Sequence, residues 1–361
     1  MSATEMRAAA RSAITGALVS FAGALAATLL RLPLPWLLGP LLAIAALHVS
    51  GRAAPAPPPL RNSAQLVVGA AVGLAFVPAV AALALSIWPL VLVNTVVATA
   101  TGLAGAWLLH RWTGVDLRTC YLSAAIGGAS DMQALAERVG ARADLVAAAH
   151  VLRFGLVVLV VPLAFAVIAG DRAAALPVAA TPASFSLVRF AALLAIAALA
   201  GALACRADVP NAWGIAPLLA SCACAVSGLH LGAVPASVVH AGQLVIGWSL
   251  GSRFSAGFFR SRPRFLVAVA AYTLAALLVT VIVGSVLGNL AAQSIPSVVL
   301  GSAPGGVAEM SLTASQLSLD VPLVTSLQLT RVLAAALLTA PLLVLLQRAG
   351  MLTSGRRDSS A

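Results

Sequence analysis

The sequence predicts an all-α polytopic membrane protein made of two inverted repeats. Each repeat has about five transmembrane helices and one re-entrant or broken helix, which gives about ten crossings in total. The first observation behind this prediction is composition, because 61% of the 361 residues are apolar and 9% are charged. Soluble domains carry about 25% charged residues. The second is that apolar runs long enough to cross a bilayer fill most of the chain. The third is that its two halves match each other.

The charge distribution is also that of a membrane protein. The formal net charge is +11, and all 21 basic residues are arginines. They lie in small groups between apolar runs, which is typical of cytoplasmic loops. We therefore expect the lipid bilayer as a partner and no nucleic acid. The four cysteines lie in or beside apolar segments without a nearby histidine, so we expect them to pack rather than to bind a metal.

The N-terminal segment resembles a signal peptide, with arginines before an apolar stretch. However, "AGALAA" at 22–27 recurs as "AGALAC" at 200–205, inside a segment that cannot be a leader. We therefore interpret it as the first helix of a repeated unit.

The duplication continues along the chain at an almost constant spacing. "PWLLGPLLA" at 35–43 matches "AWGIAPLLA" at 212–220, and "QLVVGAAVGLAF" at 65–76 matches "QLVIGWSLGSRF" at 243–254. The second pair repeats a G-x-x-x-G pattern, which favours close helix packing in membranes. Internal repeats are a common construction of secondary transporters.

Each repeat is expected to contain five helices and one weakly apolar, glycine-containing segment. The expected helices are 12–30, 35–49, 62–81, 86–109 and 145–169, then 186–204, 212–229, 240–256, 265–289 and 322–346. The glycine-containing segments are 118–140 and 296–316, which we interpret as re-entrant hairpins or discontinuous helices. The expected domains are a first repeat (1–169), a linker (170–184), a second repeat (185–347) and a cytoplasmic tail (348–361).

Arginine placement predicts that the repeats are inverted. In the first repeat, arginines lie in the loops after the second and fourth helices, and in the second repeat they lie after the third helix, around 253–264. By the positive-inside rule, equivalent loops then face opposite sides of the membrane. We expect a multi-pass protein of the bacterial inner membrane with both termini in the cytoplasm. Twelve crossings with parallel repeats is the alternative.

Two matched hexapeptides are the candidate substrate or ion site. "GGASDM" at 127–132 and "GGVAEM" at 305–310 each precede a helix start. A helix that begins inside the membrane points free N–H groups and a positive dipole end at its surroundings. The candidate residues are Gly127, Gly128, Ser130, Asp131, Gly305, Gly306 and Glu309. The simpler alternative is that the two acids only complement their own helix starts.

Two matched arginines lie one helix further on, in apolar surroundings. Arg153 and Arg331 need partners there, because a charge inside a membrane helix is costly. Either they form permanent ion pairs with Asp131 and Glu309, or they bind an anionic group of the substrate. His150 lies on the same helix face as Arg153 and is a candidate proton carrier, although its counterpart is a glutamine.

Together the motifs resemble one protein family. They are "LPLPWLLGPLLA", "RNSAQLVVGAAVGLAF", "GGASDM…LRF", "VPNAWGIAPLLA", "AGQLVIGWSLGSRF" and "PGGVAEMSLTA…LTR", between residues 12 and 347. The chain resembles the AbrB family of bacterial inner-membrane proteins, whose membrane domain is duplicated. That resemblance carries two labels, a regulator of gene expression and an ammonia monooxygenase. The five histidines lack metal-ligand spacing, and no segment is free to read DNA, so neither label is supported by the residues.

These observations favour a secondary, ion-coupled transporter of a small polar or anionic solute that works by alternating access. The alternative is a membrane-embedded regulator that binds a ligand and acts indirectly on gene expression. We expect no enzyme activity, cofactor or metal. Sodium and protons both remain candidates for the coupling ion, and a homo-oligomer remains open.

Overall fold

A computed structural model describes residues 3–74, 87–125, 129–169, 186–209, 211–229, 231–254 and 262–348. Within these ranges the regular elements are all helices. Six helices are long and apolar enough to cross a membrane, namely Ala10–Leu29, Trp88–Thr113, Ala143–Phe165, Leu187–Arg206, Pro263–Leu290 and Val321–Leu346. The chain is therefore an all-helical protein with several candidate membrane spans, as the composition predicts.

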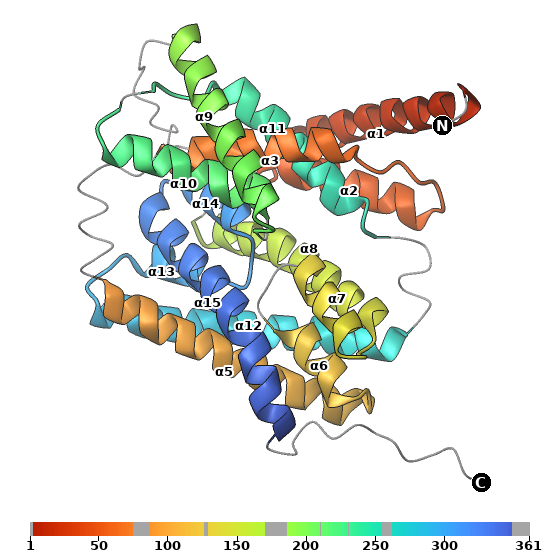
Figure 1. Cartoon of the computed structure of the whole chain (residues 1–361), viewed down its shortest axis with the longest axis vertical. Helices are drawn as coiled ribbons and strands as arrows, with labels where there is room; N and C mark the ends of the chain where they lie inside the picture. The colour runs from red at the N-terminus through yellow and green to blue at the C-terminus, as the bar shows by residue number, and fades with distance from the viewer. Residues whose placement is uncertain are drawn as a thin grey trace.

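The helices follow one another in the same order in both halves (Figure 1). The first half contains α1 (Ala3–Leu29), α2 (Pro35–Val49), α3 (Pro58–Gly73), α5 (Trp88–Thr113), α6 (Leu117–Ala124), α7 (Ala129–Arg138) and α8 (Ala143–Ala169). The second half contains α9 (Leu187–Arg206), α10 (Ala212–Val226), α11 (Ala236–Gly251), α12 (Pro263–Leu290), α13 (Ile295–Ser302), α14 (Val307–Gln316) and α15 (Val321–Arg348).

Helix lengths and backbone details repeat between the halves. Helices α2 and α10 both have 15 residues, α3 and α11 both have 16, α6 and α13 both have 8, and α7 and α14 both have 10. The residues that precede α2 and α10, Leu34 and Asn211, share a left-handed conformation with φ of 48° and 50°. A non-glycine residue rarely adopts this conformation, so its occurrence at equivalent positions shows that the two halves share local backbone geometry.

The helices form two bundles (Figure 1). Bundle A contains the first three helices of each half, α1, α2, α3, α9, α10 and α11. Bundle B contains the remaining described helices, α5 to α8 and α12 to α15. Most helix contacts lie within one bundle, and the larger contacts between bundles are α14 with α3 and α8 with α11. The bundle boundary therefore cuts across the duplication, because each bundle takes helices from both halves.

Glycines allow the helices of bundle A to pack backbone against backbone. A Cβ atom on Gly69 of α3 would overlap the carbonyl oxygen of Gly214 in α10, and one on Gly247 of α11 would overlap that of Leu37 in α2. The same holds for Gly39 in α2, which lies against the carbonyl of Gly23 in α1. The close packing predicted from the repeated G-x-x-x-G pattern is confirmed at Gly69 and Gly247.

Helix α14 connects the two bundles. Near its N-terminal end, Val307 packs into a small buried cluster with Val72 of α3 and Leu218 of α10. At its C-terminal end, the side-chain Oε1 of Gln316 accepts a hydrogen bond of 3.1 Å from the backbone N–H of Leu34. Helix α7, its counterpart in the first half, packs against α6 and α8 of its own bundle. The two halves therefore meet bundle A differently.

Four helices are shorter than a usual membrane span. Helices α2, α3, α10 and α11 have 15 or 16 residues, which corresponds to about 24 Å at most. The hydrocarbon core of a bilayer is about 30 Å thick. The described residues thus contain six candidate spans, fewer than the ten crossings predicted. Neither the count of ten nor the inverted orientation of the repeats follows from these six helices. The tail of the predicted third helix, 75–81, lies outside the described residues.

We expect Gly247→Ala to destabilise bundle A, because the new methyl group meets the backbone of α2 and cannot rotate away. Overpacking of this kind costs about 1–3 kcal/mol. The measurement is the Tm of the purified protein in detergent. Gly102→Ala in α5 is the matched control, since the nearest atom to its added Cβ is 3.6 Å away. Equal Tm values for the two variants would contradict the close approach of α2 and α11.

Candidate functional site

The second predicted site segment is a break between two short helices. Helix α13 ends at Ser302, Ala303 is extended with φ of −61° and ψ of 140°, and α14 begins after Gly306. A Cβ atom on Gly306 would overlap the carboxylate of Glu309. The acid therefore folds back over the start of its own helix, and glycine leaves room for it.

The first predicted segment has the same arrangement where the structure describes it. Helix α6 ends at Ala124, and Ala125 is extended with φ of −55° and ψ of 144°. Gly127 and Gly128 lie outside the described residues. Ser130 and Asp131 belong to the first turn of α7, but their side chains are not described. No contact of these four residues therefore enters the description of the site.

Arg331 holds the end of the half-helix α13. Its Nη1 donates hydrogen bonds to the carbonyl oxygens of Ser302, at 3.2 Å, and of Ala303. Its Nη2 donates to the carbonyl oxygen of Gly305 at 2.7 Å and to the side-chain Oε1 of Gln328 at 2.5 Å. The guanidinium therefore pairs the carbonyl groups that the break leaves without helical partners.

Arg153 makes the equivalent contacts in the first half. Its Nη1 lies 2.9 Å from the carbonyl oxygen of Ala124 and 3.4 Å from that of Ser123, at the end of α6. Its Nη2 lies 3.0 Å from Nδ1 of His150. Both arginines are buried, with 7% of Arg153 and 2% of Arg331 exposed. A cation at the C-terminal end of a helix is electrostatically favourable.

His150 and Gln328 occupy the same position in the two networks. Nε2 of His150 lies 2.8 Å from the carbonyl oxygen of Leu122, while Nε2 of Gln328 donates to that of Leu300 at 3.0 Å. Each side chain also accepts a hydrogen bond from its neighbouring arginine. The network thus needs one donor and one acceptor, which neutral histidine supplies as well as glutamine does. The proton-carrier role of His150 stays a prediction.

The predicted permanent ion pair is not formed by Arg331 and Glu309. In the described part of the chain an ion pair joins Arg142 to Asp144, but none joins Arg331 to Glu309. Backbone carbonyl groups and Gln328 take the place of the acid around Arg331. The reason is geometric, because Glu309 is turned toward Gly306 and toward the charge of Arg253, which follows α11 of bundle A. Glu309 therefore lies where bundle B faces bundle A.

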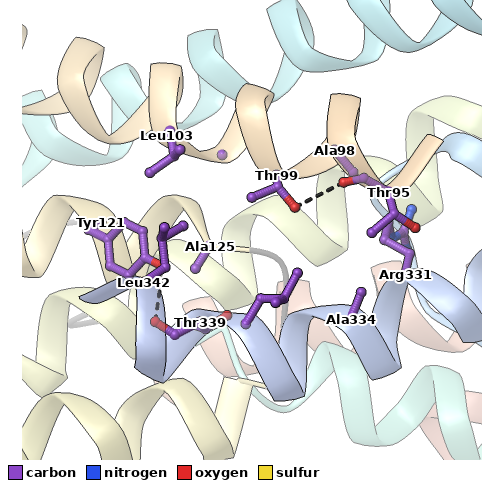
Figure 2. Close-up of a pocket in the computed structure, with 12 residues that line it drawn as sticks. Thr95, Ala98, Thr99, Leu103, Tyr121, Ala125, Arg331, Ala334, Thr339 and Leu342 are labelled. Atoms are coloured by element: carbon purple, nitrogen blue, oxygen red, sulfur yellow. Dashed lines mark hydrogen bonds between the residues drawn. The ribbon is translucent and has the colours of Figure 1, made fainter. Parts of the chain in front are cut away.

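Two small cavities adjoin the arginines, one on each side of Ala98 in α5. Cavity 1 lies between α5 and α15, with Arg331 and Thr95 at one end and Tyr121 and Thr339 at the other (Figure 2). The hydroxyl group of Tyr121 donates to the backbone carbonyl of Thr339 at 3.0 Å.

Cavity 2 has polar groups from three helices and from the second break. It is lined by Arg153 of α8, Asn94 of α5, Tyr272 of α12, and Ser302 and Pro304 beside the break. Each cavity has a volume of about 30 Å³, which is room for about two water molecules.

The cavities bring each arginine near the break of the other half. Arg331 shares cavity 1 with Ala125, and Arg153 shares cavity 2 with Ser302 and Pro304. The charges of the two arginines are close enough to repel each other. Residues of the two repeats, far apart in the sequence, therefore surround one electropositive region.

The contribution of α5 to the site was not predicted from the sequence. Asn94, Thr95, Thr99 and Thr101 line the cavities from this helix. A signal was present, because an asparagine inside the apolar run "VLVNTVVATATG" is costly in a membrane and marks a functional position. The residue that matches Asn94 in the second half is Tyr272. Because the two residues differ, a comparison of the two halves does not single out this position.

A comparison with family models decides the relationship of the chain. The model described as "Transition state regulatory protein AbrB" matches residues 36–347. The chain belongs to the AbrB family. The match covers both halves of the AbrB-family chain, including the two arginines and the described part of both breaks.

Two curated relatives are similar over most of their length. A protein of Escherichia coli strain K12 named "Putative regulator AbrB" is 26% identical over 320 residues, which cover 86% of this chain and 89% of that protein. A protein of Bacillus subtilis strain 168 named "Uncharacterized protein YhjN" is 25% identical over 273 residues, which cover 70% of each. No solved structure matches the chain significantly.

We expect His150→Gln to keep the fold stable, because Gln328 performs the same task in the second half. His150→Leu should lower the stability by about 1–3 kcal/mol, since it leaves the carbonyl of Leu122 and a donor of Arg153 unpaired in a buried place. The measurement is the Tm of both variants in detergent. A His150→Gln variant as unstable as His150→Leu would contradict the matched roles.

Proposed function

We propose that this AbrB-family protein is a secondary transporter that carries a small polar or anionic solute across the bacterial inner membrane. It works by alternating access, with bundle B moving against bundle A. The observation that carries the proposal is the electropositive region between the two breaks, with a small cavity beside each buried arginine. Transporter sites are typically formed near the bilayer midplane by discontinuous helices from two repeats.

The unequal contacts of the two halves support alternating access. Helix α14 packs against α3 of bundle A, whereas α7 packs against α6 and α8. If the repeats are inverted, α7 and α14 point to opposite sides of the membrane. A second state in which α7 takes the place of α14 would then open the opposite side, and two states of similar energy are what such a transporter needs.

The small volume of the cavities fits a closed conformation. About 30 Å³ holds water but no metabolite. The bundles meet in the small apolar cluster at Val307 and in a larger one, where Val158 of α8 and Leu312 of α14 pack with residues of α2, α3 and α11. A movement of bundle B that separates these clusters would enlarge the space around the arginines without breaking either bundle.

The arginine networks favour proton over sodium coupling. In discontinuous helices, the carbonyl groups at the end of a half-helix are groups that coordinate sodium. Here the guanidinium groups of Arg153 and Arg331 already bond with those carbonyl groups. Glu309, which faces bundle A near Arg253, is the described acid best placed to take up a proton.

The inverted arrangement with about ten crossings and cytoplasmic termini is part of this proposal. We expect single cysteines at 82–85 and at 256–262 in a cysteine-free chain to react from opposite sides of the membrane. The measurement is labelling by a membrane-impermeant maleimide in cells and in inverted vesicles. Labelling of both segments from one side would refute the inversion.

The proposal is tested by flux in proteoliposomes after cross-linking the bundles. In a cysteine-free chain, a Val72→Cys/Val307→Cys pair joins α3 to α14, and we expect its oxidation to abolish uptake from a pool of labelled metabolites. The control is Ser311→Cys/Thr325→Cys, whose native hydroxyl groups are 2.6 Å apart within bundle B. Its oxidation should leave uptake unchanged, and uptake should continue in sodium-free buffer under a pH gradient.

A ligand-binding regulator is the second candidate, favoured by the printed names of the family model and of the Escherichia coli relative. A regulator function predicts that a metabolite binds to the purified protein but is not carried into proteoliposomes.

In the cross-linking test, uptake that survives oxidation of the Val72→Cys/Val307→Cys pair would contradict the movement of bundle B.

A further inference from the structure

Asn94 is a buried polar side chain without a partner. It lies in the middle of α5 and is 4% exposed. Its Nδ2 has no hydrogen-bond partner among the described residues, and the side chain lines cavity 2. A buried amide group without a partner is destabilising, so its presence on an apolar helix indicates that something else binds there.

Arg153 borders the same cavity with its positive charge. A guanidinium carries five N–H donors, and the described contacts of Arg153 with Ala124, Ser123 and His150 use three of them. The described contacts of Arg331 use all four of its Nη donors. Cavity 2 therefore combines the charge of Arg153 with the unpaired amide group of Asn94.

The other residues that line cavity 2 indicate the sign of the charge on the ligand. Ser302 contributes a hydroxyl group that is buried and has no partner among the described residues. Among the described residues that line the cavity there is one arginine and no acid. Free donors around a cation, without a nearby carboxylate, favour an oxyanion.

The shape of the site favours a carboxylate over a larger oxyanion. The guanidinium of Arg153 is planar and its donors form a fork, which matches the two oxygens of a carboxylate. The cavity is small, with a volume of about 30 Å³, so in this conformation it favours a group of the size of a carboxylate over a hydrated dianion. Ala276, Val279 and Val283 of α12 form an apolar wall against which a short hydrocarbon stem can pack.

We propose that cavity 2 is the substrate subsite and that it binds the carboxylate of a small organic acid, held by Nδ2 of Asn94, by Arg153 and by the hydroxyl group of Ser302. This inference rests on the proposed transport function and specifies its substrate class. Asn94 is then the residue that determines specificity. Its amide group donates a hydrogen bond to a carboxylate, whereas an aspartate at the same place would repel that ligand.

The test measures binding to the full-length protein in detergent. The probes are acetate, lactate, pyruvate and succinate, compared with phosphate, sulfate and chloride at equal ionic strength, and the readout is the Tm. We expect at least one carboxylate to raise the Tm of the wild type. Asn94→Leu and Asn94→Asp should weaken its apparent affinity about tenfold or more, the effect of losing one hydrogen bond to a charged group.

Two controls keep the result interpretable. Thr273→Val in α12 removes a buried hydroxyl group that already donates to the carbonyl of Val269, so it should bind like the wild type. Asn94→Ser keeps a donor at the site and should retain part of the affinity if Asn94→Leu proves unstable. A response to phosphate or sulfate only, no response to any carboxylate, or equal affinity in the Asn94 variants would overturn the inference.

The failure of this inference differs from failure of the proposed function. Carboxylate binding that depends on Asn94 without uptake into proteoliposomes leaves the subsite intact and removes transport. Uptake that is unaffected by Asn94→Leu and Asn94→Asp leaves transport intact and removes the subsite.

Discussion

The interaction on which the rest of the structure depends is the contact of a buried arginine with the end of a half-helix. A helix that stops inside an apolar environment leaves carbonyl groups unpaired, and lipid offers them no partner. Arg153 and Arg331 supply donors to those carbonyl groups from the neighbouring long helices. The carbonyl groups in turn stabilise a charge that an apolar helix could not otherwise carry. Each break and its arginine therefore require each other.

The two arginine-stabilised breaks explain the division into bundles. The broken helices and the helices that carry the arginines all lie in bundle B, while the glycine-packed helices of both halves form bundle A. The backbone contacts inside bundle A hold its helices close together. Helix α14 carries the larger contact between the bundles, including the cluster at Val307 and the hydrogen bond of Gln316 with Leu34. The proposed movement therefore concentrates where this short helix, which follows a glycine, meets bundle A.

The same arrangement accounts for the charge around the proposed substrate. Because Glu309 is turned toward Arg253 and not toward Arg331, Arg331 is compensated by dipoles rather than by an acid. The dipoles of carbonyl groups neutralise the charge of an arginine less than an acid in an ion pair does. The region between the two breaks therefore keeps a preference for anions. A regulator that only binds such an anion would need the same pocket but not the movable contact between the bundles. A measurement of the movement between the bundles therefore distinguishes a transporter from a regulator more clearly than a measurement of binding does.

The sequence by itself determined the all-helical class with several candidate membrane spans, the duplication, and the positions of both breaks and both arginines, because apolar length, repeated motifs and costly charges are local properties of the chain. Only the tertiary structure decided the partners. The acids and arginines share a constant spacing, but Arg331 bonds with carbonyl groups, since backbone partners carry no sequence signal. The role of Asn94 also needed the structure, because its matched residue is Tyr272 and the cavity they share forms only where α5, α8 and α12 meet near the break of the other repeat.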